Sequence, residues 1–251
     1  DLIISICVFL SGFSCFAQLY YFQPLLPDLA KDFILSASES SFAISFSTLG
    51  MVFGLFTTMF VADRIPRKKM IGTGLLSSSI FSVAASFSPT FLPLILLSAA
   101  KGFLLSGATS VSMAYIAEEV SSRNKGKIMG LYIAGNALGG MAGRVISSWI
   151  GALYTWRIAS VSIGLICALF AILFLLFSPR STNFMPRKES FHTLIIANLQ
   201  LITSKALIPF YLTGGLILGV FIQLPGILSD QSTFQFPGTL YPLYLLSLIH
   251  I

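Results

Sequence analysis

A lysine inside a long apolar run, Lys101, is the residue in this sequence best placed to do chemistry. If that run is a helix beginning at Phe91, Lys101 lies about 15 Å from its start, near the middle of a lipid bilayer. A cation at this depth is costly unless it faces a polar interior, and a lysine in apolar surroundings can release its proton. We therefore expect Lys101 to face the inside of a helix bundle beside Gly102, as a substrate-binding or coupling charge. A locally paired structural lysine and a tolerated substitution are the alternatives.

Three further polar side chains lie within apolar runs and are candidates for the same site: Gln18, Thr48 and Asn136. Residues of these types also form hydrogen bonds between packed membrane helices, which is the alternative role for each. Asn136 lies about 13 Å into its own helix. No Asp or Glu lies at this depth in the spans, so we expect the partners of Lys101 to be neutral dipoles such as Asn136, a bound anion, or groups outside these spans. Arg144, farther along that helix, is expected to extend its side chain to the outer interface.

No arrangement of residues typical of an enzyme or a metal site is present in the sequence. Cys7, Cys15 and Cys167 lie in apolar runs, where a free cysteine behaves as a small hydrophobic side chain. His192 and His250 are far apart and show no metal-ligand spacing. We therefore expect no enzyme activity, no cofactor and no bound metal.

The composition is typical of a membrane protein with several spanning helices. Of the 251 residues, 55% are hydrophobic and 10% are charged, whereas about 25% charged residues are typical of a soluble domain. The mean hydropathy is +0.89. These values exclude a soluble enzyme, a nucleic-acid binder and a disordered chain, although the net charge of +6 by itself would suit a nucleic-acid partner.

Seven apolar runs are long enough, or nearly so, to cross a hydrocarbon core, which takes about 20 helical residues. Because lipid leaves no water to satisfy open strand edges, each run is expected to be a helix. The predicted spans are Leu2–Tyr21, Phe42–Val61, Ile71–Phe87, Phe91–Ala117, Ile128–Ile150, Ile158–Phe177 and Ala206–Leu224.

Basic residues gather in alternate connections between these spans, at Arg64–Lys69, Arg123–Lys127 and Arg180–Lys205. The positive-inside rule therefore predicts that these connections and the N-terminus face the cytoplasm. Aromatic side chains with a polar edge prefer the headgroup region. We expect such side chains at the outer interface, namely Tyr20, Tyr21, Phe22, Trp149, Tyr154 and Trp156.

The spans divide the chain into three parts. Residues 1–178 are expected to form a six-helix unit, residues 179–205 a polar cytoplasmic linker, and residues 206–251 the start of a second unit. The last apolar stretch, Leu240–Ile251, is too short to span a bilayer.

The connection after the second span resembles a loop motif of the major facilitator superfamily, G-x-x-x-D-R-x-G-R-K/R-K/R. Met59 and Pro66 replace the two glycines of the motif. The residues that match it are Asp63, Arg64, Arg67, Lys68 and Lys69. An aspartate at a helix end beside cations can pair across the cytoplasmic mouth of a bundle, and the alternative is a basic anchor that only sets orientation.

The fifth span resembles the antiporter motif of the same family, G-x-x-x-G-P-x-x-G-G. Gly135, Gly139 and Gly143 match it, whereas Gly140 and Arg144 replace the proline and the last glycine. Glycines four residues apart share a helix face and permit close helix contact. Structural packing is therefore the alternative to a face that moves.

The fourth span carries Ser98 where similar transporters have the arginine of an R-x-x-x-G motif, and Lys101 follows three residues later. The resemblance covers about residues 2–225 and is nearest to bacterial proton-driven drug or sugar efflux permeases. It implies an all-α, polytopic transmembrane bundle of twelve helices in two halves. This chain would hold the six-helix N-terminal half and a seventh helix.

The function that the resemblance implies is secondary active efflux of a small molecule, coupled to protons by alternating access. Asp63 and Arg64 would latch the cytoplasmic gate. The implied location is the bacterial cell inner membrane, with several passes, and the partners are the lipid bilayer, a small-molecule substrate and protons, without nucleic acid. Self-association is left open. The alternative is a truncated or frameshifted transporter product with no transport activity alone.

Overall fold

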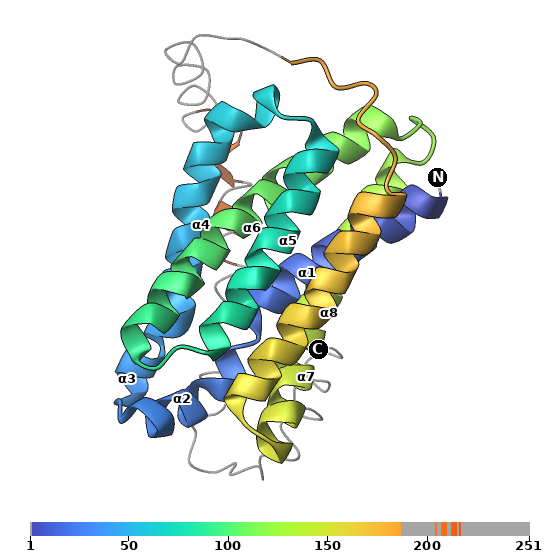
Figure 1. The fold of residues 1–251 in the computed structure, drawn as a ribbon. Coiled ribbons are helices and arrows are strands. Elements are labelled where there is room, and N and C mark those ends of the chain that lie inside the picture. Colours follow the sequence, from blue (N-terminus) through green and yellow to red (C-terminus); the bar gives the residue numbers. More distant parts are fainter. Residues whose placement is uncertain (1, 187–203, 205–206, 210–211, 215, 217–251) are drawn as a thin grey trace. The chain divides into compact units, whose positions relative to one another are not determined.

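The structure is a computed structural model and describes residues 2–186, 204, 207–209, 212–214 and 216 (Figure 1). Its long helices are α1 (Leu2–Tyr20), α4 (Phe42–Val61), α5 (Arg67–Ser86), α6 (Phe91–Glu119), α7 (Lys125–Leu153) and α8 (Trp156–Phe177). Short helical segments complete it: η1 (Gln23–Leu25), α2 (Leu26–Phe33), α3 (Ala37–Ser40) and η2 (Ala62–Arg64). No strand occurs in this part of the chain, so the expected all-α bundle is confirmed.

The chain divides into two compact units, Asp1–Arg187 and Lys188–Ile251. The long helices all belong to the first unit. The predicted seventh span, Ala206–Leu224, lies largely outside the described residues, and so does the whole of residues 237–251.

Within the part of the chain that the structure describes, four segments are long and apolar enough to cross a membrane: Leu2–Phe33, Ala37–Arg64, Phe91–Glu119 and Trp156–Phe177. The helices α5 and α7 are as long as their neighbours but less apolar. Serines and three basic residues lower the hydropathy of α5, and glycines with Lys125, Lys127 and Arg144 lower that of α7. Both helices nonetheless pack lengthwise in the same bundle, as the sequence predicts.

The long helices pack as two triplets with matching contacts. In the first unit α1 packs on α7 and α4 packs on α6, while α5 contacts α6 and α8 contacts α1. Exchanging α1, α4 and α5 for α6, α7 and α8 converts each of these pairs into another of them. The pair α5 with α8 maps onto itself, whereas the contact of α7 with α8 has no counterpart between α4 and α5. This is the contact pattern of two related three-helix repeats.

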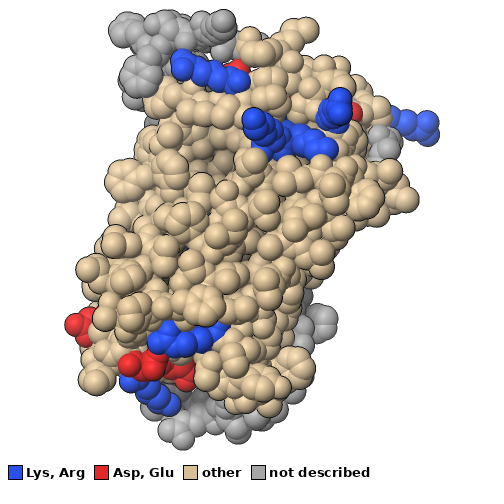
Figure 2. Space-filling view, in the orientation of Figure 1, with Lys and Arg blue, Asp and Glu red and all other residues tan. Residues whose placement is uncertain are grey.

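Charged side chains lie at the two ends of the bundle and leave an uncharged band between them on the face shown in Figure 2. We call one end the basic end. It contains the α4–α5 connection, the α6–α7 connection and the residues after α8. We call the other the capped end, because η1 and α2 fold over it. An uncharged band between two charged rims is what a bilayer requires of a spanning bundle.

The capped end is closed by apolar packing and one ion pair. Leu25 and Leu29 are buried in a cluster with Trp156. The Asp32 carboxylate accepts hydrogen bonds from the Trp156 indole N–H and from the Arg157 guanidinium, both at 2.9 Å. Arg157 also donates to the carbonyls of Ser86, the last residue of α5, and of Ser88, and thereby ties α2, α5 and α8 together.

This cap corrects part of the predicted outer aromatic belt. Trp149 and Tyr154 are exposed, as expected of interface residues. The other four aromatic side chains are at most 5% exposed and point into the bundle: Tyr20, Tyr21, Phe22 and Trp156. They are buried because the chain does not leave the bundle after α1 but folds back as η1 and α2.

Candidate functional site

Lys101 lies in the core of the bundle, with 1% of its surface exposed. It stands on α6 next to Gly102, whose backbone meets α4 so closely that an added Cβ would lie 1.8 Å from the Ser47 carbonyl oxygen. The side chain points inward, as its depth in the sequence predicts. The close helix contact at Gly102 fixes the backbone from which Lys101 extends.

Two aromatic rings surround the Lys101 ammonium. Its Nζ lies 4.5 Å from the ring centroid of Tyr21 and 4.8 Å from that of Phe22. Among the described residues Nζ has no hydrogen-bond partner, and the buried charged residues include no Asp or Glu. Asn136, the neutral partner expected for Lys101, therefore accepts no hydrogen bond from it. Cation–π contacts of about 0.5–2 kcal/mol each take its place.

The Tyr21 ring is held in position by three helices. Its hydroxyl lies 2.9 Å from the Ser160 hydroxyl of α8, and Ser160 donates to the Ser82 carbonyl of α5. The Ser147 hydroxyl of α7 donates to the Tyr21 carbonyl at 2.8 Å. The Tyr21 hydroxyl is therefore held by α8, which is itself bonded to α5, and the Tyr21 backbone is held by α7.

Gln18 belongs to the same buried network. Its Nε2 donates to the Ser14 hydroxyl, and its Oε1 accepts from the Ser82 hydroxyl at 3.2 Å. Both ends of the amide thus have partners, one on α1 and one on α5. The geometry agrees with the interhelical hydrogen-bonding role that was the alternative for Gln18.

Neither Asn136 nor Thr48 forms a hydrogen bond with the Lys101 ammonium. Asn136 faces α1, where its Oδ1 would lie 2.3 Å from a Cβ added at Gly12. Thr48 is exposed on α4, and its hydroxyl donates to the Ile44 carbonyl of its own helix. The structure therefore does not bring the four predicted site residues into one cluster.

Arg144 differs from the expectation of a side chain that reaches the interface. It is 3% exposed, and its guanidinium carbon lies 4.7 Å from the ring centroid of Tyr20. Tyr20 points inward because η1 and α2 cover the end of α1. The aromatic surface at this end thus receives cations from two helices, Lys101 from α6 and Arg144 from α7.

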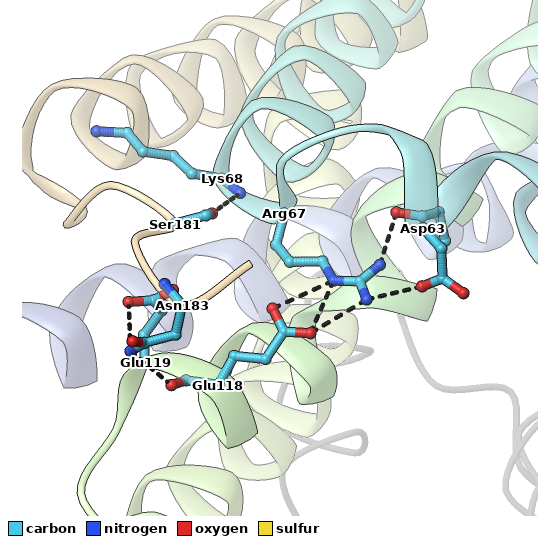
Figure 3. Close-up of polar contacts among 8 residues, drawn as sticks. Asp63, Arg67, Lys68, Glu118, Glu119, Ser181 and Asn183 are labelled. Carbon is cyan, nitrogen blue, oxygen red and sulfur yellow. Dashed lines mark hydrogen bonds and ion pairs between the residues drawn. The ribbon is translucent and has the colours of Figure 1, made fainter. Parts of the chain in front are cut away.

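At the basic end, Arg67 joins three segments (Figure 3). Its guanidinium donates to Asp63 at 2.9 Å, to the Ala62 carbonyl at 2.6 Å, and to Glu118 of α6 at 3.1 and 3.2 Å. Burial disfavours the charged form of Arg67, but the hydrogen bonds and charges of Glu118 and Asp63 outweigh it and raise the pKa of Arg67. The partner of Asp63 is thus Arg67, whereas Arg64 is exposed.

The segment after α8 also binds this end of the bundle. The Ser181 hydroxyl accepts from the Lys68 backbone N–H at 3.0 Å, and the Lys68 ammonium donates to the Ser178 carbonyl. Glu119 accepts hydrogen bonds from Thr182 and Asn183 (Figure 3). The first residues of the predicted linker therefore lie across α5 and α6.

The predicted packing glycines lie against α1. A Cβ added at Gly135, Gly139 or Gly143 would lie 2.6, 2.2 or 2.7 Å from backbone atoms of α1. The related pair α4 and α6 uses the same device, since a Cβ at Gly50 would lie 2.0 Å from the Ala99 carbonyl oxygen. Both interfaces thus depend on direct backbone contact.

Sequence reasoning missed the residues that partner the predicted charges. Tyr21 and Phe22 contact Lys101 from the start of the fold-back after α1, and Glu118 contacts Arg67 from a helix 51 positions away. The sequence does contain one signal, the acidic pair Glu118–Glu119 beside a basic connection. It shows that carboxylates are available but not which cation they bind.

Comparisons with known proteins agree on the family. The model of the Major Facilitator Superfamily matches residues 5–251. The chain is 35% identical to an uncharacterized transporter of Buchnera aphidicola subsp. Schizaphis graminum, with 88% of this chain and 54% of that protein covered. It is also 35% identical to the inner membrane transport protein YnfM of Escherichia coli K12, with 88% and 53% covered.

A solved structure supports the same fold. The D-xylose-proton symporter superposes with a TM-score of 0.71 at 16% identity, over 97% of this chain and 64% of that one. The chain spans about half the length of the curated relatives it matches. The paired three-helix repeats, the glycine contacts and the family match together show that this chain belongs to the Major Facilitator Superfamily of multi-pass membrane transporters.

Proposed function

We propose that this chain supplies the first half of a secondary active transporter that exports a small molecule in exchange for protons by alternating access. The observation that carries the proposal is the Lys101 ammonium. It is enclosed in a transporter half and has no hydrogen-bond partner among the described residues. Ionisable groups at membrane depth mark substrate or proton pathways by default, because the cost of burying them needs a functional reason.

Lys101 suits an exchange of substrate for protons. A lysine in apolar surroundings can give up its proton when a path to solvent opens. If the substrate and the proton compete for this one group, binding of the substrate releases the proton and binding of a proton releases the substrate. That competition is the requirement for an antiporter, and Lys101 is the residue to which we assign it.

The ion network of the basic end is the proposed gate. Arg67 links the α4–α5 connection to α6 through Asp63 and Glu118. A gate must hold in one state and release in the other, and charge-assisted hydrogen bonds around one guanidinium offer such a contact. We assign the latch to Asp63, Arg67 and Glu118, and no longer to Arg64.

We further propose that the basic end faces the cytoplasm and that the protein resides in the bacterial inner membrane. The basic residues of this end support the orientation through the positive-inside rule, and the name of the Escherichia coli relative supports the location. Because the chain spans about half of its relatives, we propose the transport activity for a protein that contains both halves. Absence of activity in this chain alone remains the alternative prediction.

The test is proton movement in inverted membrane vesicles, recorded with a pH-sensitive dye while candidate small molecules are added. This chain is expressed alone and joined to the second half of the Escherichia coli relative. We expect Lys101→Met to abolish substrate-driven proton release, whereas Lys127→Met at the basic end should preserve it. Transport by Lys101→Met with an unchanged pH dependence would make Lys101 a tolerated substitution.

A further inference from the structure

A groove of about 200 Å³ lies between α4 and α5, with α6 as its floor. In Figure 1, α6 runs behind the gap between these two helices. We call it the α4–α5 groove. The residues that line it include Gly54 and Thr57 of α4, Thr73 and Ser77 of α5, and Phe103 and Gly107 of α6.

The groove departs from the internal symmetry of the bundle. Under the exchange of the two triplets, α4 and α5 correspond to α7 and α8. The helices α7 and α8 pack against each other, whereas α4 and α5 are not among the packed pairs. The connection around Pro66 joins α4 to α5 only at the basic end. The groove is therefore a local feature of this triplet and not a general consequence of the repeat.

Four of the five hydroxyl groups that line it are bonded within their own helices. Thr57 donates to the Phe53 carbonyl at 3.0 Å, and Thr73 donates to the Lys69 carbonyl at 2.7 Å. Thr58 and Ser106 likewise bond to carbonyls of their own helices. Apart from the Ser77 hydroxyl, the lining thus offers apolar side chains, methyl groups and glycine backbone. An unfilled space of this kind forfeits dispersion contacts, so an apolar chain fits it better than a polar solute.

Two exposed cations lie at the basic end of the bundle, in the connection that joins α4 to α5 and in the first turn of α5. Two of the four basic residues here are engaged within the bundle, Arg67 with Asp63 and Glu118, and Lys68 with Ser178. The side chains of Arg64 and Lys69 are exposed, and no ion pair with a described residue is recorded for either. Lys69 lies on the same face of α5 as Thr73 and Ser77. It stands one turn before Thr73, nearer the N-terminal end of α5.

The distances suit one lipid molecule. From Lys69 to Ser77 the helix rises about 12 Å, which runs from the rim toward the middle of the bilayer. A phosphate at Arg64 and Lys69 would therefore sit at headgroup level, at the basic end of the bundle. In a bilayer the acyl chain gains little from the hydrophobic effect, so selectivity must come from the headgroup charge.

We propose that the α4–α5 groove binds one acyl chain of an anionic phospholipid, whose phosphate contacts Arg64 and Lys69. The proposal does not depend on the transport function. The probe is phosphatidylglycerol, titrated onto the purified chain in detergent and counted by native mass spectrometry. Phosphatidylethanolamine, which has no net charge, and soluble glycerol phosphate serve as comparison ligands.

The charge is tested with R64Q/K69Q against the control R123Q/K127Q, which removes two cations from another connection at the same end. Attraction of anionic lipid is worth about 1 kcal/mol per basic residue. The loss of both contacts should therefore weaken phosphatidylglycerol binding about 30-fold, or about 2 kcal/mol. The control should bind like the unaltered chain. Equal weakening by the two variants would indicate diffuse attraction and overturn the proposal.

The groove is tested by filling it with T57L. Thr48→Leu is the matched control, because Thr48 is also exposed on α4 and also bonds to a carbonyl of its own helix. We expect only T57L to weaken binding, by about tenfold. Unchanged binding by T57L, or equal binding of phosphatidylethanolamine or glycerol phosphate, would refute the site. If T57L does not fold, phosphatidylglycerol binding by R64Q/K69Q and its control R123Q/K127Q still tests the proposal.

Discussion

Replacing Glu118 by glutamine should destabilise the bundle more than replacing Asp63 by asparagine. Glu118 accepts hydrogen bonds from two nitrogen atoms of Arg67, and its side chain is 26% exposed. Asp63 accepts one, and its side chain is 40% exposed. Arg67 itself is 10% exposed at the side chain, so a lost partner leaves a nearly buried charge with less compensation.

The magnitudes follow from these contacts. Hydrogen bonds to a charged group contribute about 1.5–3 kcal/mol. The negative charge of Glu118 lies in the last turn of α6, where the helix dipole disfavours it, so its removal in E118Q returns about 0.5 kcal/mol. We expect E118Q to cost about 1.5 kcal/mol and D63N, as an exposed ion pair, about 0.5 kcal/mol. For a chain of this size these correspond to losses of roughly 3–6 °C and 1–2 °C in Tm.

The assay is thermal unfolding of the purified chain in detergent, followed by loss of the monodisperse peak. Glu119→Gln is the matched control, since among the described residues the two Glu119 oxygens accept from neutral donors of Thr182 and Asn183, and glutamine keeps one of these oxygens. Because the lost hydrogen bonds are exposed and involve no charged donor, we expect E119Q to cost less than E118Q, about 0.5–1 kcal/mol. A D63N effect equal to or larger than that of E118Q, or an equal effect of E119Q, would refute the assignment of Glu118 as the main partner of Arg67.

Three further predictions use the same preparation or intact cells. Gly139→Ala should destabilise the bundle strongly, because its Cβ would lie 2.2 Å from the Phe13 carbonyl oxygen. The control Gly130→Ala has open space around the new Cβ and should be neutral or stabilising by up to about 1 kcal/mol. Equal Tm values for the two variants would contradict the close contact at Gly139. Asp32→Asn should alter the fluorescence of Trp156, which loses a charged hydrogen-bond acceptor, and an unchanged spectrum would contradict the cap. Reporter fusions after Lys69 and Lys127 should report the cytoplasm, and fusions after Lys31 and Pro89 should report the outside. A reversed pattern would contradict the proposed orientation.

The elements and the ends of the bundle were predictable from the sequence. The spans are set by unbroken apolar runs, and lipid permits only helices for such runs. All six described spans are helices at the expected places. The inward direction of Lys101 also follows from the sequence, because a cation at that depth has no stable alternative in lipid.

The partners of the polar residues were decided only by the tertiary structure. Tyr21 was expected at the membrane surface, but η1 and α2 fold back and bury it beneath Lys101. Gln18 was a candidate for the substrate, but Ser82 of α5 binds its amide. Such contacts join helices that are distant along the chain, and no local pattern specifies which faces will meet.

The sequence by itself therefore determined what each segment must be, because the bilayer acts on every residue according to its own depth and polarity. The tertiary structure decided which groups touch. Glycines such as Gly139 and Gly102 bring particular backbones into contact, and this close packing then selects Glu118 for Arg67 and the Tyr21 ring for Lys101. These choices depend on the relative rotation and position of whole helices, which are set by packing across the bundle.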